Sequence, residues 1–339
     1  MIEILHPVDD RARIDQLAST LTTVDAWDDA LDELGALNRF DHQAPPIPPD
    51  LDEISRYVHY PWRGVLVRLP DSPTFLRMRT ARNRLLITDD EQAVWSSSLI
   101  AVAGLSVGAA LLHTCSMTGA RRFHVADPDV LGLTNLNRLA GSVCDLGVSK
   151  AVLAQRRILE TDPYSDVTPF PDGFTADAAS GFLGAPEPVG VVLEEVDDLA
   201  AKVEIRRRAR ERGIPVVMVT DDGDGVIVDV ERYDLEPDYP LFHGRADGIE
   251  RLGADELRDP QRRIALVTAI VGDDIGERTR AALGQVGRTI PTWPQLGTAS
   301  TLAGAAGAAV ARAVVCGVPV PSGRRSIRLD DLSAASLGG

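Results

Sequence analysis

Short apolar runs alternate with helical segments through the middle of the chain, and this order predicts an α/β fold. The run Leu99–Ala103 is apolar throughout and ends at a glycine, which is typical of a buried parallel strand. The apolar segment Ala109–Met117 predicts a helix that stops at Gly119. Arg122–Ala126 predicts the next strand. Strand, glycine turn, helix and strand in this order form a βαβ unit with parallel strands.

The same alternation continues toward the C-terminus. A strand beginning at Val191, a helix over Leu199–Arg210 and a strand over Ile214–Val219 extend the sheet, and Val226–Val230 adds another strand. Ala299–Cys316 is rich in small residues and contains a charged arginine, so we expect it to pack on the sheet or on a dimer mate. The predicted fold is a Rossmann-like α/β domain with a mostly parallel sheet flanked by helices.

The first 75 residues have a different pattern and predict a small helical region. Ile14–Leu21 and Ala26–Leu37 have helical apolar spacing, and Val65–Leu69 predicts a small strand. The Pro-rich segment His42–Pro49 indicates a linker or an extended arm. We therefore expect an N-terminal region over 1–75 and one large domain over 76–339, divided into a nucleotide half (76–225) and an acceptor or dimer half (226–339).

The glycine turn between the first two strands is a candidate phosphate loop. Gly104 and Gly108 allow backbone N–H groups to approach a phosphate at the start of a helix. Asp127 follows the second strand, where an acid can accept hydrogen bonds from ribose hydroxyls. Ser106 stands where a full G-x-G-x-x-G pattern would have its second glycine, so an ordinary crossover without a ligand is the alternative.

Several polar side chains follow within a short span, and they change the expected ligand. Asp129, Asn135, Arg138 and Lys150 bring an acid, an amide and two cations to the same strand end. Two cations near one phosphate group favour a nucleoside triphosphate over a nicotinamide cofactor, because the β- and γ-oxygens need neutralising. The alternatives are a surface salt bridge for Arg138 and a solvated first-turn lysine for Lys150.

In this order the residues resemble the E1-like (ThiF/MoeB/HesA) superfamily of adenylyltransferases. The family pattern D-x-D-x-V-x-x-S-N-L-x-R followed by G-x-x-K matches Asp127–Arg138 and Gly147–Lys150. The family acid that ends a later strand corresponds to Asp197, and its upstream arginine segment corresponds to Arg79–Arg84. The resemblance covers about residues 79–317, and details of the glycine turn are similar to a bacterial branch sometimes fused to nitroreductase-like domains.

The resemblance implies a complete adenylation site. A carboxylate substrate would attack the α-phosphorus of ATP and form an acyl adenylate, with release of pyrophosphate. Asp197 would hold Mg²⁺ through the phosphates, and Arg82 would reach the ATP of the other subunit, which makes the active unit a homodimer. The implied catalytic set is Arg82, Arg138, Lys150 and Asp197. The implied nucleotide-binding set is Gly104, Ser106, Gly108, Asp127, Asp129, Asn135, Arg138 and Lys150.

This chain departs from the family pattern at several positions, and the missing cysteines affect the expected acceptor of the acyl group. The glycine turn is shorter than usual, Asp198 replaces an asparagine and adds charge near the metal, and a helix cap is the alternative role for Asp197. A C-x-x-C pair is absent, so no structural zinc is expected. The cysteines Cys115, Cys144 and Cys316 are expected to pack rather than react, with Cys144 the least secure of the three. We therefore expect transfer to an amine, amide or hydroxyl, and not to a thiol.

The composition of the chain limits its partners. The 339 residues carry a net charge of −15, which argues against nucleic-acid binding but still permits ATP through a few local cations. Three scattered cysteines indicate a reducing compartment, and the N-terminus has no signal-peptide pattern, so a cytoplasmic protein without a membrane span is expected. Gly338–Gly339 resembles the end of a ubiquitin-like carrier, but a flexible tail is the favoured interpretation.

Three hypotheses follow from the sequence. The first is an ATP-dependent adenylyltransferase whose carboxylate is a small molecule or the C-terminus of a carrier protein. The second is a NAD-dependent oxidoreductase on the same βαβ unit, although no Tyr-x-x-x-Lys pattern is visible. The third is a non-catalytic E1-like scaffold that binds a nucleotide or a partner.

Overall fold

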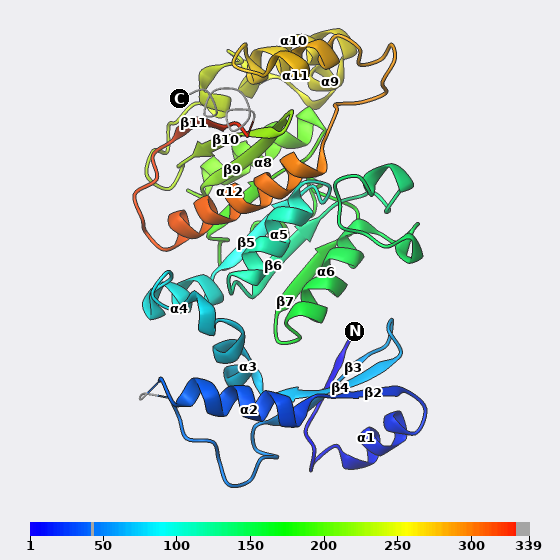
Figure 1. The fold of residues 1–339 in the computed structure, drawn as a ribbon. Coiled ribbons are helices and arrows are strands. Elements are labelled where there is room, and N and C mark those ends of the chain that lie inside the picture. Colours follow the sequence, from blue (N-terminus) through cyan, green and yellow to red (C-terminus); the bar gives the residue numbers. More distant parts are fainter. Residues whose placement is uncertain (42–43, 330–339) are drawn as a thin grey trace, which may run out of the picture. The chain divides into compact units, whose positions relative to one another are not determined.

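The chain forms two compact units, Met1–Gln92 and Ala93–Gly339, in a computed structural model that describes residues 1–41 and 44–329 (Figure 1). The two units divide inside helix α4 (Asp89–Ser97). The boundary expected from the sequence at residues 75–76 lies inside the preceding helix α3 (Ser72–Arg79). Gly338–Gly339, which the sequence singled out, lies outside the described residues, as does the start of the proline-rich segment at His42.

Unit 1 is an α/β unit and not the helical region that the sequence predicted. Its described residues contain a four-stranded sheet in the order β1-β3-β4-β2, with β2 parallel to β4 and the other pairs antiparallel. The predicted helices and the strand at Val65 are present, but three strands were missed. Every residue of β2 is exposed, so this strand carries no apolar alternation to detect. The elements are β1 (Glu3–Leu5), α1 (Arg11–Ala18), β2 (Thr22–Asp25), α2 (Trp27–Asn38), β3 (Ser55–Tyr60), β4 (Val65–Pro70), α3 and η1 (Ala81–Asn83).

Unit 2 contains, within the described residues, a seven-stranded sheet in the order β11-β10-β9-β8-β5-β6-β7. The five neighbouring strands β9, β8, β5, β6 and β7 run parallel, and β10 pairs antiparallel with both β9 and β11. The predicted mostly parallel sheet is confirmed. The strands are β5 (Leu99–Ala103), β6 (Arg122–Ala126), β7 (Asp166–Phe170), β8 (Val191–Glu194), β9 (Val216–Asp222), β10 (Gly225–Glu231) and β11 (Gly323–Ile327).

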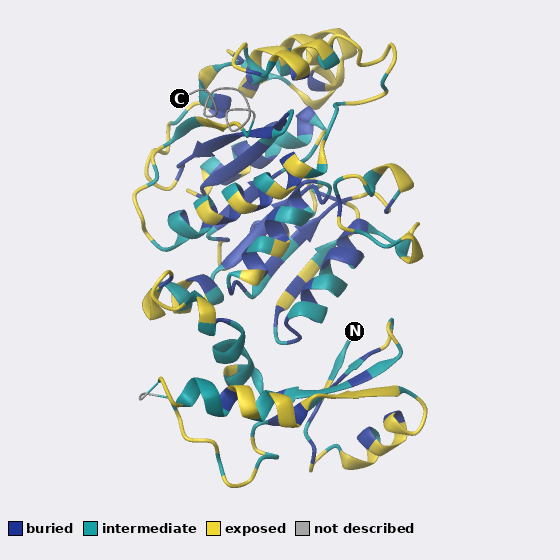
Figure 2. Cartoon of the chain, viewed as in Figure 1, coloured by how far each residue is buried: buried dark blue, intermediate teal, exposed yellow. Residues whose placement is uncertain are grey.

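Helices cover both faces of this sheet, and the buried residues of Figure 2 concentrate in the sheet itself. Val102 of β5 packs into a core with α5, α6 and α12, whereas its neighbours Ala101 and Ala103 pack into a second core with α7 and α8. This alternation within one fully buried strand is the pattern of a parallel sheet between two helical layers. The helices are α5 (Gly108–Met117), α6 (Lys150–Thr161), α7 (Ala179–Phe182), α8 (Leu199–Glu211), α9 (Ala254–Arg258), α10 (Pro260–Val271), α11 (Glu277–Leu283) and α12 (Gly297–Val315), with short turns η2 (Leu133–Asn135), η3 (Val143–Asp145), η4 (Leu241–Gly244) and η5 (Ile249–Arg251).

Helix α12 packs closely against α5 through glycines. A Cβ at Gly304 would lie 2.8 Å from the backbone oxygen of Ala110, and one at Gly307 would lie 2.6 Å from a methyl carbon of Leu111. Among the described residues, α12 alone is long and apolar enough to match a membrane span by length and composition. Its small-residue face lies in the core with the sheet, as the sequence predicted.

A buried network of charged side chains connects α8 to the sheet. The guanidinium of Arg206, on α8, contacts Glu194 of β8 and donates from Nε to Glu231 Oε2 of β10 at 2.6 Å. Lys202 Nζ adds a contact of 3.0 Å to Glu194. Burial by itself raises the pKa of Glu194, but Lys202 and Arg206 outweigh it and hold that pKa below its ordinary value. The network therefore fixes α8 over β8, just before the strand end that carries Asp197.

Candidate functional site

The predicted site residues gather where parallel strands end. Strands β6, β5, β8 and β9 are neighbours and run in the same direction, so their carboxyl ends meet at one edge of the sheet. Asp127 follows β6, Gly104 follows β5, Asp197 follows β8, and Asp221 lies at the end of β9. In open α/β sheets this edge is where ligands bind.

The turn after β5 is shaped by a glycine that no other residue can replace without strain. Gly104 has a φ of +86°, and a Cβ there would lie 2.3 Å from the backbone oxygen of Glu195. The turn ends at Gly108, where α5 begins. Backbone N–H groups at the start of a helix attract phosphate, because they have no partner within the helix. The close approach of Gly104 to Glu195 therefore sets the shape of the turn that the sequence predicted to bind phosphate.

Asp127 connects this turn to the second strand. Its Oδ2 accepts a hydrogen bond from the backbone N–H of Leu105 at 2.6 Å, and its Oδ1 accepts one from Asp129 at 2.8 Å. The residue is 5% exposed. Burial raises the pKa of Asp127, while the Lys150 ammonium and the two backbone N–H groups oppose the rise. The predicted ribose acid thus also holds the turn in place.

Lys150 is buried, so the interpretation as a solvated first-turn lysine is wrong. It begins α6 and is 5% exposed. Its Nζ lies 2.9 Å from Asp129 Oδ2 and 3.8 Å from Asp127 Oδ1. A buried ammonium is costly unless charged or polar groups surround it. The carboxylates of Asp127 and Asp129 therefore hold a cation beside the turn.

Asn135 and Arg138 lie on the loop between β6 and α6. The side-chain oxygen of Asn135 accepts a hydrogen bond from the backbone N–H of Gly132 at 2.9 Å and closes the short turn η2. Arg138 Nε donates to Ser106 Oγ at 2.9 Å, which connects this loop to the glycine turn. Its Nη1 donates to the backbone oxygen of Thr134 at 3.1 Å.

Arg138 forms no salt bridge among the residues that the structure describes, so the surface ion-pair alternative is wrong. Burial lowers its pKa, and the charges of Asp197 and Asp221 oppose that effect. A half-buried guanidinium whose hydrogen bonds go to neutral groups is suited to an anion. Arg138, Lys150 and the start of α5 therefore supply positive charge around the same turn.

Asp197 and Asp198 have different surroundings. The Asp198 carboxylate caps α8 by accepting hydrogen bonds from the backbone N–H groups of Ala200 and Ala201 at 3.4 and 3.3 Å. The helix-cap alternative for Asp197 is therefore wrong, because its neighbour fills that role. Asp197 is exposed and favours the charged form of Arg138. Its carboxylate remains available at the strand end.

Asp221 is a site residue that the sequence reasoning missed. It is 4% exposed, and neither carboxyl oxygen has a hydrogen-bond partner among the described residues. Burial raises its pKa to about 6, with Asp197 adding to the rise. Gln295 and Arg138 oppose the rise, although Gln295 lies outside hydrogen-bonding geometry. An acid just beyond a predicted strand was the signal that could have identified it.

Glu195 is a second acid that the sequence reasoning missed, and it lies against both glycines of the turn. Its Oε1 accepts a hydrogen bond from the backbone N–H of Val219 at 2.7 Å, which joins the end of β8 to β9. Its side chain lies 3.5 Å from where a Cβ of Gly108 would be. Burial raises the pKa of Glu195 well above its ordinary value.

The remaining predicted residues lie elsewhere. Arg82 belongs to unit 1, where it lies in η1 and is exposed. Cys115 is buried, and burial raises its pKa to about 12, so it packs as expected. Cys144 is exposed and does not pack, which corrects that expectation, and Cys316 is half-buried. Within residues 1–41 and 44–329, no group of three or more His, Cys, Asp or Glu side chains is arranged to hold a metal ion.

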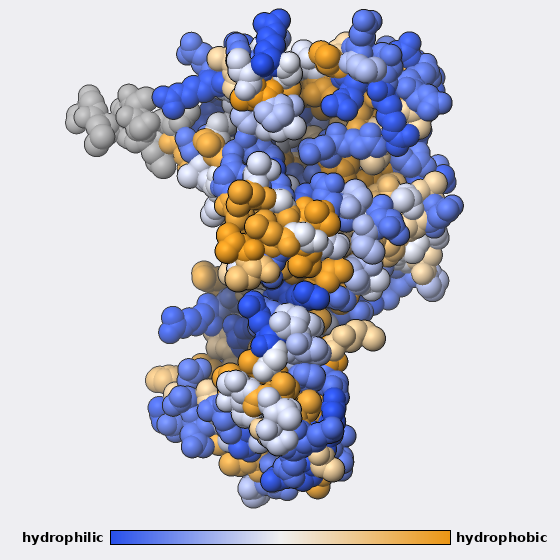
Figure 3. Space-filling model, turned by 90° about the vertical axis from the view of Figure 1, so that its right-hand side faces the viewer, coloured by the Kyte–Doolittle hydropathy of each residue, from blue (hydrophilic) through white to orange (hydrophobic). Residues whose placement is uncertain are grey.

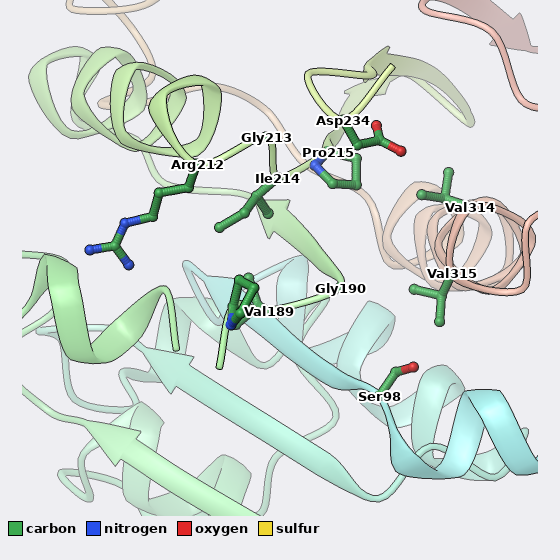
Figure 4. A pocket seen from close by; sticks show the side chains of 11 residues that line it. Ser98, Val189, Gly190, Arg212, Gly213, Ile214, Pro215, Asp234, Val314 and Val315 are labelled. Carbon is green, nitrogen blue, oxygen red and sulfur yellow. The ribbon is translucent and has the colours of Figure 1, made fainter. Parts of the chain in front are cut away.

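A pocket of about 350 Å³ opens at the opposite edge of the sheet (Figure 4). Ser98, Gly190 and Pro215, which line it, precede β5, β8 and β9, so the pocket lies at the amino ends of these strands. No predicted site residue lines it. The pocket is therefore separate from the candidate site.

Known proteins share both sequence and fold with this chain. An uncharacterized protein of Mycobacterium tuberculosis (strain CDC 1551 / Oshkosh) is 35% identical over 328 residues, which are 96% of this chain and 44% of that protein. A probable molybdopterin-synthase adenylyltransferase of Porphyra purpurea is 29% identical over 83 residues, 24% of this chain and 22% of that protein. The chain thus spans less than half the length of either relative.

A solved structure shares the fold. The tRNA N6-threonylcarbamoyladenosine dehydratase TcdA of E. coli, in complex with ATP, has a TM-score of 0.52 at 16% identity and covers 71% of this chain and 95% of its own. The model of the ThiF family matches residues 80–272, which include the glycine turn, both cations and every acid at the sheet edge. This match spans more than half of the chain, and the protein therefore belongs to the ThiF family, within the E1-like superfamily.

Proposed function

We propose that the protein is an ATP-dependent adenylyltransferase that activates a carboxylate as an acyl adenylate. The observation that carries the proposal is the buried Lys150 beside Asp127, next to a glycine turn that Arg138 contacts through Ser106. Two cations at one phosphate turn suit a triphosphate better than a dinucleotide. The ATP complex of TcdA and the name of the Porphyra relative support the same conclusion.

The residues present can perform the first half-reaction. A carboxylate oxygen attacks the α-phosphorus, the bond from that phosphorus to the bridging oxygen of the β-phosphate breaks, and pyrophosphate leaves with the electron pair. Arg138, Lys150 and the backbone N–H groups of the turn stabilise the charge on the departing oxygens. Asp127 would accept hydrogen bonds from the ribose. Most of the rate enhancement would then come from positioning and electrostatics.

Mg²⁺ fits this site. Asp197 offers an exposed carboxylate at the strand end, and one carboxylate plus nucleotide phosphates is a usual oxygen set for Mg²⁺. Bound there, the ion would supply further neutralisation of the phosphates.

The acyl group would pass to a nucleophile that is not a thiol. Cys115 is buried with a raised pKa, and Cys316 lies at the end of α12. Cys144 is exposed in η3, on the loop that precedes Lys150, so the proposal requires that acyl transfer survive the substitution Cys144→Ala. An amine, amide or hydroxyl of a second substrate would attack the carbonyl carbon and release AMP.

The active unit would be a homodimer in which Arg82 reaches the partner's nucleotide. Apolar side chains on the loops between β6 and α6 support such an interface, because Val130, Leu133, Val143 and Leu146 are exposed. These loops lie on the right in Figure 1, the side that faces the viewer in Figure 3, and hydrophobic residues gather on that face. Exposed apolar clusters of this kind mark interaction surfaces.

Exchange of labelled pyrophosphate into ATP tests the first half-reaction. Across a panel of carboxylic acids, we expect exchange with the wild type and a loss of roughly 100-fold or more in Arg138→Ala and Asp197→Ala, because both remove charge stabilisation. Arg122→Ala is the control, since Arg122 pairs with Glu187 on the surface and should leave exchange unchanged.

Two outcomes would contradict the proposal. Unchanged exchange in both site variants would refute the assigned roles. Absence of exchange, together with calorimetry that shows tighter binding of NADH than of ATP with Mg²⁺, would favour the oxidoreductase.

A further inference from the structure

The position of Asp221 along the sheet edge places it closer to a second substrate than to the nucleotide. Along the sheet edge the order of strands is β6, β5, β8, β9, so Asp127, the glycine turn, Asp197 and Asp221 follow one another. If ribose lies over β6 and the phosphates over β5, as in the proposed function, β9 lies beyond β8 on the far side of the nucleotide from the ribose. Asp221 would therefore face a second substrate that binds beside the nucleotide.

Two acids that follow Asp221 in the chain, Asp222 and Asp224, already have hydrogen-bond partners. Both oxygens of Asp222 accept hydrogen bonds from the backbone N–H of Gly276, at 2.8 and 3.1 Å. Asp224 accepts a hydrogen bond from the hydroxyl of Thr298 at the start of α12. Asp221 differs from both, because its two buried oxygens have no hydrogen-bond partner among the described residues.

A buried carboxylate without partners is costly, and a second carboxylate placed beside it would add repulsion. Arg138 is the nearby cation, and in the proposed function it faces the phosphates. A simple carboxylic acid would thus meet an uncompensated negative charge at the point of attack. A substrate that brings its own cation would remove this cost and fill both open acceptors of Asp221.

We propose that the carboxylate substrate carries a protonated amine and that this ammonium binds Asp221. The substrate class is then an amino acid or another amino-carboxylate, and the activated product is an aminoacyl adenylate. This inference rests on the proposed adenylation and adds its specificity. Asp221 acts on substrate choice, and ATP binding does not depend on it.

Matched pairs of acids test the inference. Pyrophosphate exchange is measured with amino-carboxylates of varied length, short peptides included, and with the same skeletons lacking the amine. We expect the wild type to prefer the amine-bearing member by on the order of 100-fold, because a buried acceptor left unpaired rejects the analogue strongly. In Asp221→Asn the preference should fall to within about twofold, while calorimetry shows ATP–Mg²⁺ affinity within about twofold of the wild type.

Asp224→Asn is the matched control, because it removes the same charge three positions away and should keep the preference. Asp221→Glu should retain part of it. Equal exchange with both members of each pair, or a preference that survives in Asp221→Asn, would overturn the inference while adenylation stands. Loss of ATP binding in Asp221→Asn would move Asp221 to the nucleotide site and also overturn it. A wild type without exchange for any acid would refute the proposed function itself.

Discussion

At the sheet edge, the type of a residue does not by itself determine the role of its side chain. Asp197 and Asp198 are adjacent acids, yet Asp198 caps α8 and Asp197 is exposed beside Arg138. Lys150 is at the first position of a helix, where lysines usually reach water, yet it is buried against Asp129. In each case the neighbours supplied by the fold decide which chemistry the side chain can perform.

The raised pKa of Asp221 makes stability depend on pH. The pKa is about 6 in the folded protein against an ordinary 3.8, so the folded state keeps a proton that the unfolded state loses between about pH 4 and 6. The contribution is present in full below pH 4 and is lost as the pH rises through 6. At 1.4 kcal/mol per pKa unit, Asp221→Asn should stabilise the protein at pH 7 by up to about 3 kcal/mol.

Urea unfolding at pH 4, 5, 6 and 7 measures this effect. The difference in the free energy of unfolding between Asp221→Asn and the wild type should shrink toward pH 4. For Asp224→Asn, that difference should change little with pH. A variant that is less stable than the wild type at pH 7 would contradict the assigned burial cost.

At the scale of elements, we expect the buried charges between α8 and the sheet to stabilise the fold. Arg206 is 1% exposed and contacts both Glu194 and Glu231. Arg206→Met leaves two buried carboxylates without their main cation, and breaking a buried pair in this way costs about 3–5 kcal/mol. We expect a corresponding fall in the free energy of unfolding, measured in urea at pH 7.

The same helix provides the control. Arg208 pairs with Glu204 on the exposed side of α8, so Arg208→Met should change stability by less than about 0.5 kcal/mol. If Arg206→Met is as stable as Arg208→Met, the buried network does not hold α8 over β8.

For the whole molecule, the proposed dimer makes a prediction about mixed variants. Arg82→Ala and Arg138→Ala should each lower pyrophosphate exchange by roughly 100-fold or more. If Arg82 acts in the partner's site, a mixed dimer contains one site with both arginines intact. Random mixing should then restore about a quarter of wild-type exchange, because about half of the dimers are mixed and half of their sites are intact.

Exchange is measured after the two inactive variants are unfolded and refolded together. Each variant refolded alone is the control and should stay inactive. No recovery in the mixture would show that Arg82 serves its own subunit or has no part in the reaction.

The sequence alone predicted the local features of this protein. The strands β5 and β6 and the helices α5, α8 and α12 follow from apolar periodicity and glycine stops, which depend only on neighbouring residues. The candidate ligand-binding stretch from Asp127 to Lys150 could be recognised for the same reason, because its residues are close in the chain. The family match over residues 80–272 confirms that recognition.

Tertiary structure decided the rest, because pairing and burial depend on residues far apart in the chain. The exposed strand β2 and the arginine-containing strand β11 become strands only through their partners β4 and β10. In the sequence, Asp221 resembles an ordinary turn residue. Only the parallel order of β5, β8 and β9 brings it close to Asp197 and Arg138. Burial then left its carboxylate without a partner, a condition that no local pattern encodes.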